Sequence, residues 1–224
     1  MPDNGIEEVC WVESMIRDGR CLVAAIVAHC NLSLLNTRRC LEALQQASPD
    51  RLRGIRCILD YDGPYEESGS NGTHVFCSRH NVDYLRDPQE SQNFENGFAM
   101  LSEFNLSFDL QCTPAQLPAA AALLGRHPRV RVCVNHMGKP RDLEIIVNDA
   151  SDAAEQGSSY SIPEATAQKL AAWRAGMKLM ADLPQVYVKL SMLGFAVPGM
   201  QLNDPLVVLA LIVSLFLYVC WYDG

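Results

Sequence analysis

The sequence has no basic run, and its 18 Lys and Arg residues are outnumbered by 26 Asp and Glu residues, for a formal net charge of −8. Proteins that bind nucleic acids gather Lys and Arg against the phosphates, so this charge excludes a typical nucleic-acid surface. We therefore expect a small-molecule substrate as the partner and no nucleic acid. The composition leaves the oligomeric state open.

The sequence also lacks a CxxC pair, and its N-terminus shows no signal-peptide pattern. Several cysteines lie inside apolar runs, where a free thiol acts as a small hydrophobic group. An odd number of scattered cysteines without an export signal indicates a reducing compartment, so we expect a cytoplasmic protein. The nine cysteines are Cys10, Cys21, Cys30, Cys40, Cys57, Cys77, Cys112, Cys133 and Cys220.

Charge is absent altogether from Leu206 to Tyr222. As a helix this stretch would be roughly 25 Å long, just short of the ~30 Å core of a bilayer. Two interpretations stay open: a transmembrane anchor formed by residues 205–222, or a segment buried within the protein. We accordingly divide the chain into a domain at 1–204 and an apolar C-terminal tail at 205–224.

Strand-like and helix-like segments alternate along the first domain. Apolar runs rich in β-branched residues predict buried strands at 21–30, 54–61, 106–112, 130–136 and 186–192. Amphipathic segments predict helices at 6–17, 36–47, 88–104, 113–126 and beyond 164. This order is typical of an α/β protein with parallel strands. No glycine-rich phosphate motif follows the first strand, so an incomplete TIM-type (β/α) barrel is favoured over a dinucleotide-binding fold.

Polar side chains occur late in several of these strands. Because the carboxyl ends of barrel strands meet at one mouth, we expect a candidate site there. Alternation along a strand predicts that His136 shares a face with Val130, Val132 and Val134, and that Asn135 points away. The residues expected at the mouth are Arg56, Asp60, Asp109, Gln111, His136 and Lys189.

These residue types suggest the recognition of an anion. Arg56 can grip a carboxylate as a fork, and Lys189 can attract it as a point charge. His136 could serve as a metal ligand, a general base or a hydrogen-bond donor. The alternative is that each group has only a structural role. A polar stretch at 62–87, which contains His74 and His80, is a candidate binding loop.

Four segments together resemble the amidohydrolase-related family of TIM-barrel hydrolases. They are "LRGIRCILD", "GFAMLSEFNLSFDLQCTPAQL", "HPRVRVCVNHMGKP" and "LPQVYVKLSMLGFAVPG". The resemblance implies hydrolysis of a small lactone, ester or amide, and the family includes lactonases of sugar acids. Some members use a divalent metal such as zinc or manganese and others use none. His136, Arg56 and Gln111 match residues of the family pattern, while Asn135 replaces the usual Asp.

Two departures from the pattern bear on activity. The family opens on a strand with His-x-His, but this sequence has no histidine before His29. The family also ends on a strand with a catalytic Asp, where this chain has its apolar tail. Asp60 or Asp109 would then have to act as the base. The first hypothesis is a hydrolase, with His136 holding a metal or orienting water. The alternative is a truncated, inactive relative, tail-anchored in a membrane or acting by binding.

Overall fold

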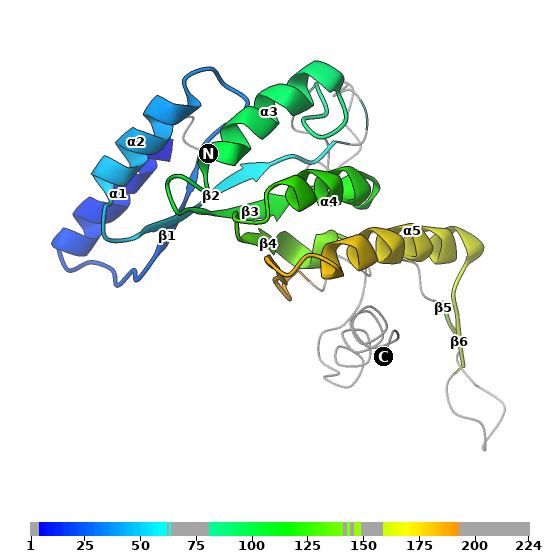
Figure 1. Ribbon diagram of the computed structural model, residues 1–224. Coiled ribbons are helices and arrows are strands. Elements are labelled where there is room, and N and C mark those ends of the chain that lie inside the picture. The colour runs from blue at the N-terminus through cyan, green and yellow to red at the C-terminus, as the bar shows by residue number, and fades with distance from the viewer. Residues whose placement is uncertain are drawn as a thin grey trace.

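The computed structural model describes residues 5–61, 63, 81–140, 143, 146–148 and 159–192 (Figure 1). Five α-helices lie in this part of the chain: α1 Gly5–Arg17, α2 Thr37–Ala47, α3 Pro88–Met100, α4 Leu117–Arg126 and α5 Glu164–Ala181. The strands are β1 Ile26–His29, β2 Leu52–Ile58, β3 Ser107–Gln111, β4 Val132–Val134, β5 Ile146–Asn148, β6 Ser159–Ser161 and β7 Val186–Val188. Two 3-10 turns, Pro114–Gln116 and Asn135–Gly138, complete the elements.

Five of the strands form one parallel sheet in the order β1-β2-β3-β4-β7. Each strand pairs with the next one in this series, without the reversal of order that marks a doubly wound sheet. Sequential parallel strands joined by helices are the arrangement of a (β/α) barrel. The predicted incomplete barrel is therefore supported, with β1 and β7 at the two edges of the described sheet. The strands β5 and β6 form a separate antiparallel pair.

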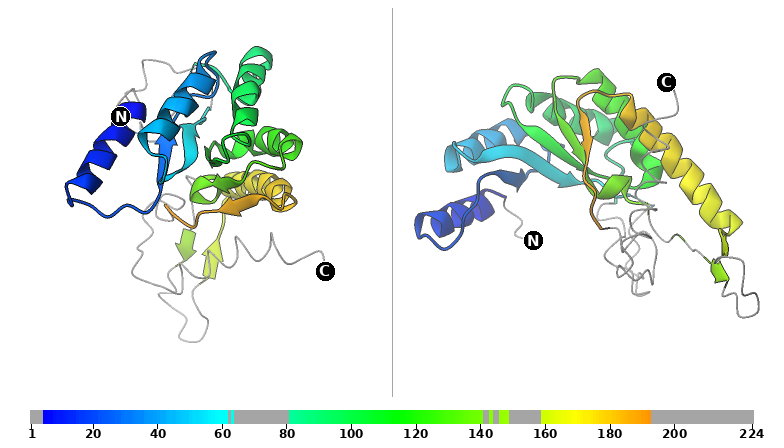
Figure 2. Two further views of the ribbon diagram at one scale, coloured as in Figure 1. Left: turned by 60° about the vertical axis from the view of Figure 1, so that its left-hand side comes forward. Right: turned by 90° about the horizontal axis from the view of Figure 1, so that it is seen from below.

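The helices α2, α3, α4 and α5 cover one face of this curved sheet, which we call the outer face (Figure 2). Side chains that point toward it are apolar and buried, because alternate residues of a strand share a face. Phe108 of β3 shows this most clearly. Its ring meets the rings of Phe94 and Phe98, both on α3, at centroid distances of 5.9 and 5.4 Å.

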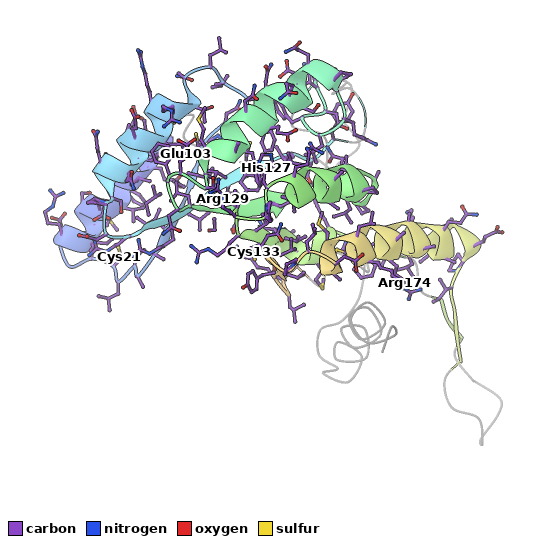
Figure 3. The ribbon with its side chains drawn as sticks, viewed as in Figure 1. Cys21, Glu103, His127, Arg129, Cys133 and Arg174 are labelled. Atoms are coloured by element: carbon purple, nitrogen blue, oxygen red, sulfur yellow. The ribbon has the colours of Figure 1, made fainter. Side chains whose placement is uncertain are left out.

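The outer layer is tied together where α4 ends. His127 follows α4 and packs its ring edge-on against Phe98 (Figure 3). Its Nε2 also lies 2.9 Å from Glu95 Oε1 on α3. Arg126 donates two further hydrogen bonds to the Glu95 carboxylate. These bonds, chiefly those from Arg126, lower the pKa of Glu95 to about 2. These charged side chains thus join α3 to the end of α4, two of the helices that cover the outer face of the sheet.

The sequence predicted all five helices and the five strands of the main sheet, but each strand is shorter than expected, and three differ most. The first begins at Ile26 instead of residue 21, the fourth ends at Val134, and the last ends at Val188. The predicted capping box is present, since Gln116 Oε1 accepts a hydrogen bond from the backbone N–H of Thr113 at 3.0 Å, but it opens the 3-10 turn Pro114–Gln116, and α4 begins only at Leu117. Most of the 62–87 stretch and the whole tail at 205–224 lie outside the described residues. Within the described residues, no helix combines the length and apolar character that crossing a membrane requires.

Candidate functional site

The site lies where the carboxyl ends of β2, β3, β4 and β7 meet. Arg56 of β2 is in register with Asp109 of β3, and Asp109 is in register with Cys133 of β4, which Figure 3 labels. These positions alternate with Phe108, so they belong to the face of the sheet that the helices leave open. We call it the inner face. His29 extends the same row on β1, and its Nδ1 lies 3.2 Å from the carbonyl oxygen of Arg56.

A continuous chain of side-chain hydrogen bonds crosses this edge of the sheet. Arg56 Nη2 donates to Gln111 Oε1, and Gln111 Nε2 donates to Asp60 Oδ2 at 2.9 Å. The same Asp60 oxygen accepts from Lys139 Nζ, and both partners of this ion pair are almost completely buried. One amide therefore fixes a guanidinium at one end and a carboxylate at the other. Burying such charges is costly unless they are paired and hydrogen-bonded, as they are here.

A second ion pair lies beside the first. Lys189, the first residue after β7, donates its Nζ to Asp109 Oδ2. Asp109 is buried, whereas 45% of the Lys189 side chain is exposed. The exposed ammonium can therefore reach a bound molecule without leaving its partner. Asp109, by contrast, serves here as the anchor of a cation.

His136 reaches the site in a way that the sequence did not indicate. The predicted strand at 130–136 is wrong at its end, because β4 stops at Val134 and the backbone turns left-handed. His136, Met137, Gly138 and Lys139 follow one another with φ of 55°, 56°, 69° and 58°. Such a run costs roughly 1–2 kcal/mol for each residue other than glycine. Backbone strain of this kind concentrates at functional sites.

The left-handed turn at 136–139 is held by its surroundings. Met137 N donates to the carbonyl oxygen of Lys189 at 3.1 Å, and Trp173 Nε1 of α5 donates to the carbonyl oxygen of Met137 at 2.7 Å. A Cβ on Gly138 would lie 2.6 Å from Met177 Sδ, so α5 also packs tightly against the turn. Helix α5 and β7 thus supply the contacts that maintain the unfavourable backbone.

The predicted side-chain alternation in this strand is also wrong. Val132 is in register with Phe108, and Val134 with Leu110, so these valines belong to the buried outer face. His136 would share that face if the strand continued. Instead the left-handed turn brings it among the charged groups of the inner face. Asn135, which the alternation predicted to point away from the mouth, is buried.

The electrostatic surroundings of His136 favour a neutral imidazole. Burial lowers the pKa of His136 below its ordinary value, since a charged ring would lose solvation. The positive charges of Arg56, Lys139 and Lys189 lower it further, and the Asp60 carboxylate opposes them. His136 Nδ1 lies 2.9 Å from Ser191 Oγ. No described residue hydrogen-bonds its Nε2, which leaves that nitrogen for a substrate or a water molecule.

The structure brings together all six residues predicted from the sequence and adds Lys139. The signal for Lys139 was present, because the lysine follows the histidine directly in "HMGKP". A single lysine in a polar stretch is usually solvated, so its sequence position alone does not single it out. Only the left-handed turn, which buries Lys139 against Asp60, reveals its place.

Three buried side-chain atoms here have no hydrogen-bond partner within the described part of the chain. They are Arg56 Nε, Asp60 Oδ1 and Asn135 Nδ2, two donors and one acceptor. Buried polar atoms are normally satisfied, so these atoms are where a bound molecule or water would complete the network.

A divalent metal does not fit these residues. His29 Nδ1 is turned to the carbonyl oxygen of Arg56, and Asp60 Oδ2 and Asp109 Oδ2 already accept from lysines. The described ranges contain no group of three or more His, Cys, Asp or Glu side chains that could hold a metal. His74 and His80 lie outside those ranges. The predicted zinc or manganese ion therefore stays a prediction, and no step below depends on it.

A comparison with protein families identifies the chain. The family model described as amidohydrolase matches residues 38–213. This chain belongs to the amidohydrolase family. The match covers β2, β3, β4 and β7, and with them the seven site residues.

Solved amidohydrolases share the fold. One from Burkholderia multivorans with bound HEPES superposes with a TM-score of 0.63 at 21% identity, covering 96% of this chain and 61% of that one. The zinc-bound form of an amidohydrolase from the same organism gives 0.61 at 22% identity, with 95% and 60% covered. The chain thus spans about three-fifths of the length of these relatives. No curated protein sequence matches it.

Proposed function

We propose that this amidohydrolase binds and hydrolyses a small anionic lactone, ester or amide at the mouth formed by β2, β3, β4 and β7. One observation carries this proposal: three cationic side chains, Arg56, Lys139 and Lys189, converge on this mouth, each held by a hydrogen bond to Gln111, Asp60 or Asp109. An acidic protein with a local positive mouth is suited to attract a carboxylate. The family supplies the reaction class, and the cations supply the preference for an anion.

In this proposal the binding groups are Arg56 and Lys189. Gln111 Oε1 accepts a hydrogen bond from Arg56 and so holds the guanidinium in place. Arg56 Nε is a buried donor with no acceptor among the described residues. Lys189 stays partly exposed while paired with Asp109. A substrate carboxylate would complete both, since charge-assisted bonds to arginine are among the strongest in proteins.

His136 is the proposed general base. A neutral imidazole with its Nδ1 beside Ser191 can take a proton from water at Nε2. Asp60, the base expected from the sequence, has one oxygen occupied by Lys139 and Gln111. Its second oxygen, Oδ1, could accept a hydrogen bond from the attacking water or from a substrate hydroxyl. We therefore give Asp60 the role of orienting the water and His136 that of accepting its proton.

A panel of lactones, esters and amides tests the proposal, each in a form with and without a carboxylate, assayed with and without zinc or manganese. We expect preference for the carboxylated forms. Arg56→Lys should raise KM ten- to hundredfold while changing kcat little, since a charged hydrogen bond contributes about 1.5–3 kcal/mol. The matched control is Arg53→Lys, because Arg53 lies on the same strand and bonds only backbone oxygens of Leu52 and Asp50.

His136→Gln separates catalysis from binding. We expect kcat to fall about 10²–10⁴-fold with KM retained, and kcat/KM of the unaltered protein to rise with pH through a value below 6.5, as the imidazole loses its proton. A pH profile unchanged by this substitution would exclude His136 as the base.

Binding without turnover is the second candidate. It is favoured by the absence of a three-ligand metal group from the described residues and by the engagement of Asp60 with Lys139. Calorimetry with the carboxylated compounds distinguishes the two. Heat of binding that Arg56→Lys reduces, without hydrolysis under any metal condition, would establish the binding protein. Neither binding nor hydrolysis would refute both.

A further inference from the structure

A buried glutamine that belongs to none of the strands holds the backbone on both sides of Asp60. Strand β2 ends at Ile58, so Leu59, Asp60 and Tyr61 lie beyond it. Gln116 Nε2 donates to the carbonyl oxygen of Leu59 at 3.0 Å, and Gln116 Oε1 accepts from the backbone N–H of Tyr61 at 3.1 Å. Backbone groups past the end of a strand need such partners when they are buried. One amide thus takes over where the strand pairing stops.

The side-chain amide of Gln116 is held in one orientation. It is fully buried, and its Oε1 also accepts from the backbone N–H of Thr113 at 3.0 Å. Its Nε2 also donates to Asp83 Oδ1 at 2.8 Å. Turning the amide over would set its N–H groups against those of Thr113 and Tyr61. A helix cap requires only the bond to Thr113, so the other three bonds need a different explanation.

The carboxylate of Asp83 is itself fixed. Asp83 is buried, its Oδ1 also accepts from the backbone N–H of Leu85 at 3.0 Å, and its Oδ2 accepts from Arg86 Nε. A buried acceptor with partners on both oxygens locks the amide that donates to it. Support of this kind behind a functional group keeps that group in a productive geometry.

Asp60 is therefore held at two levels. Gln111 and Lys139 engage its Oδ2, and Gln116 fixes the backbone to which the carboxylate is attached. Its Oδ1 is buried and has no partner among the described residues. We propose that Gln116 is a positioning residue, which places Asp60 Oδ1 relative to His136 and the bound substrate. This inference rests on the proposed function, because Gln116 acts on the reaction only through Asp60.

A double-mutant cycle on kcat tests the proposal. Gln116→Glu preserves the size of the side chain but replaces the Nε2 donor with an oxygen that faces the Leu59 carbonyl. We expect kcat to fall at least about tenfold and KM to change less than about threefold, because Arg56 and Lys189 still hold the substrate carboxylate. In the Asp60→Asn background the same substitution should change kcat less than about threefold. An equal fall in both backgrounds would overturn the proposal.

The matched control is Gln185→Glu. Gln185 is also buried, and its Nε2 also donates to a backbone carbonyl oxygen, that of Leu124, at 3.1 Å. It directly precedes β7, at the amino end of the strand and away from the mouth. Urea unfolding should show a loss of stability in both single variants, while kcat falls only in Gln116→Glu. A similar fall in kcat for the control would trace the effect to general destabilisation and overturn the proposal.

A milder variant covers the case in which Gln116→Glu does not fold. Asp83→Asn keeps an oxygen for Gln116 but loses the ion pair with Arg86. It should lower kcat severalfold, and only while Asp60 is present. A fall that persists in the Asp60→Asn background would contradict the proposal in the same way.

Failure of this inference can be told apart from failure of the proposed function. If the protein binds without turnover, the same cycle is measured on the Kd of a hydroxylated carboxylate, since Asp60 Oδ1 would accept its hydroxyl group. Binding or turnover with equal effects in both backgrounds would refute the role of Gln116 alone. A protein that neither binds nor hydrolyses the panel would refute the proposed function, and this inference with it.

Discussion

The two faces of the five-stranded sheet are built from neighbouring residues, yet they differ in almost every physical property. On the outer face, Phe108 and Val132 lie side by side in a dry apolar layer beneath the helices. One residue further along each strand, Asp109 and Cys133 lie side by side on the inner face. The outer row stabilises the fold by burying apolar surface, and the inner row keeps polar groups whose burial opposes folding. The comparison separates what this protein needs to fold from what it needs to bind.

Phe108→Ala should produce the largest effect. The ring packs against two phenylalanines of α3 and is fully buried, so its removal should cost about 3–5 kcal/mol of unfolding free energy. The matched change on the other face is Cys133→Ser, which alters one partly exposed atom and should cost less than about 1 kcal/mol. Urea unfolding of both variants measures the difference. Equal losses would show that the inner face is as much a core as the outer one.

The pair of Asp60 and Lys139 gives the next effect. Either Asp60→Leu or Lys139→Met removes one partner of a buried ion pair and should cost about 3 kcal/mol. The double variant should lose less than either single one, because no charge of the pair is then left behind. A complete double-mutant cycle in urea measures this coupling. Strictly additive losses would mean that the pair contributes as two independent residues.

The smallest effect concerns pH. The unfolded chain takes up a proton at the ordinary pKa of His136, 6.5, and the folded chain only at lower pH. The contribution of this residue to stability is therefore complete above pH 6.5, and it is lost as the pH falls from 6.5 through the lowered pKa, because in that range the unfolded chain binds the proton more readily. His136→Gln should flatten that part of the profile. Unfolding midpoints between pH 5 and 8 test it; a slope that the substitution leaves intact would assign the dependence to other groups.

Most of the fold could be predicted from the sequence, because the strands and helices that build the outer face show the same patterns each time. Runs such as Val130–Val134 and Gly54–Ile58 are apolar because parallel strands are buried, and the segments between them have helical periodicity. The lengths of the strands could not be predicted from the sequence. Residues 21–25 are as apolar as Ile26–His29, but only the latter have a strand to pair with.

The site was predicted as a set of residues but not as a geometry. Residues Arg56, Asp109 and Gln111 lie within regular strands, where alternation places side chains correctly. For His136 the same rule failed, because no local sequence pattern predicts a turn in which three residues other than glycine have left-handed backbone. That conformation is imposed by Trp173 and Lys189, which are distant in sequence. Long-range contacts overrode local preference at the position with the most chemistry.

The turn from His136 to Lys139 has a consequence for how this protein would fail. Its unfavourable backbone is maintained from outside the turn, in part by the indole hydrogen bond from Trp173 of α5. Moderate warming, or a substitution in α5, would let the turn adopt a more favourable backbone while the rest of the sheet stayed folded. Recognition would then vanish at a temperature where circular dichroism still reports a folded molecule.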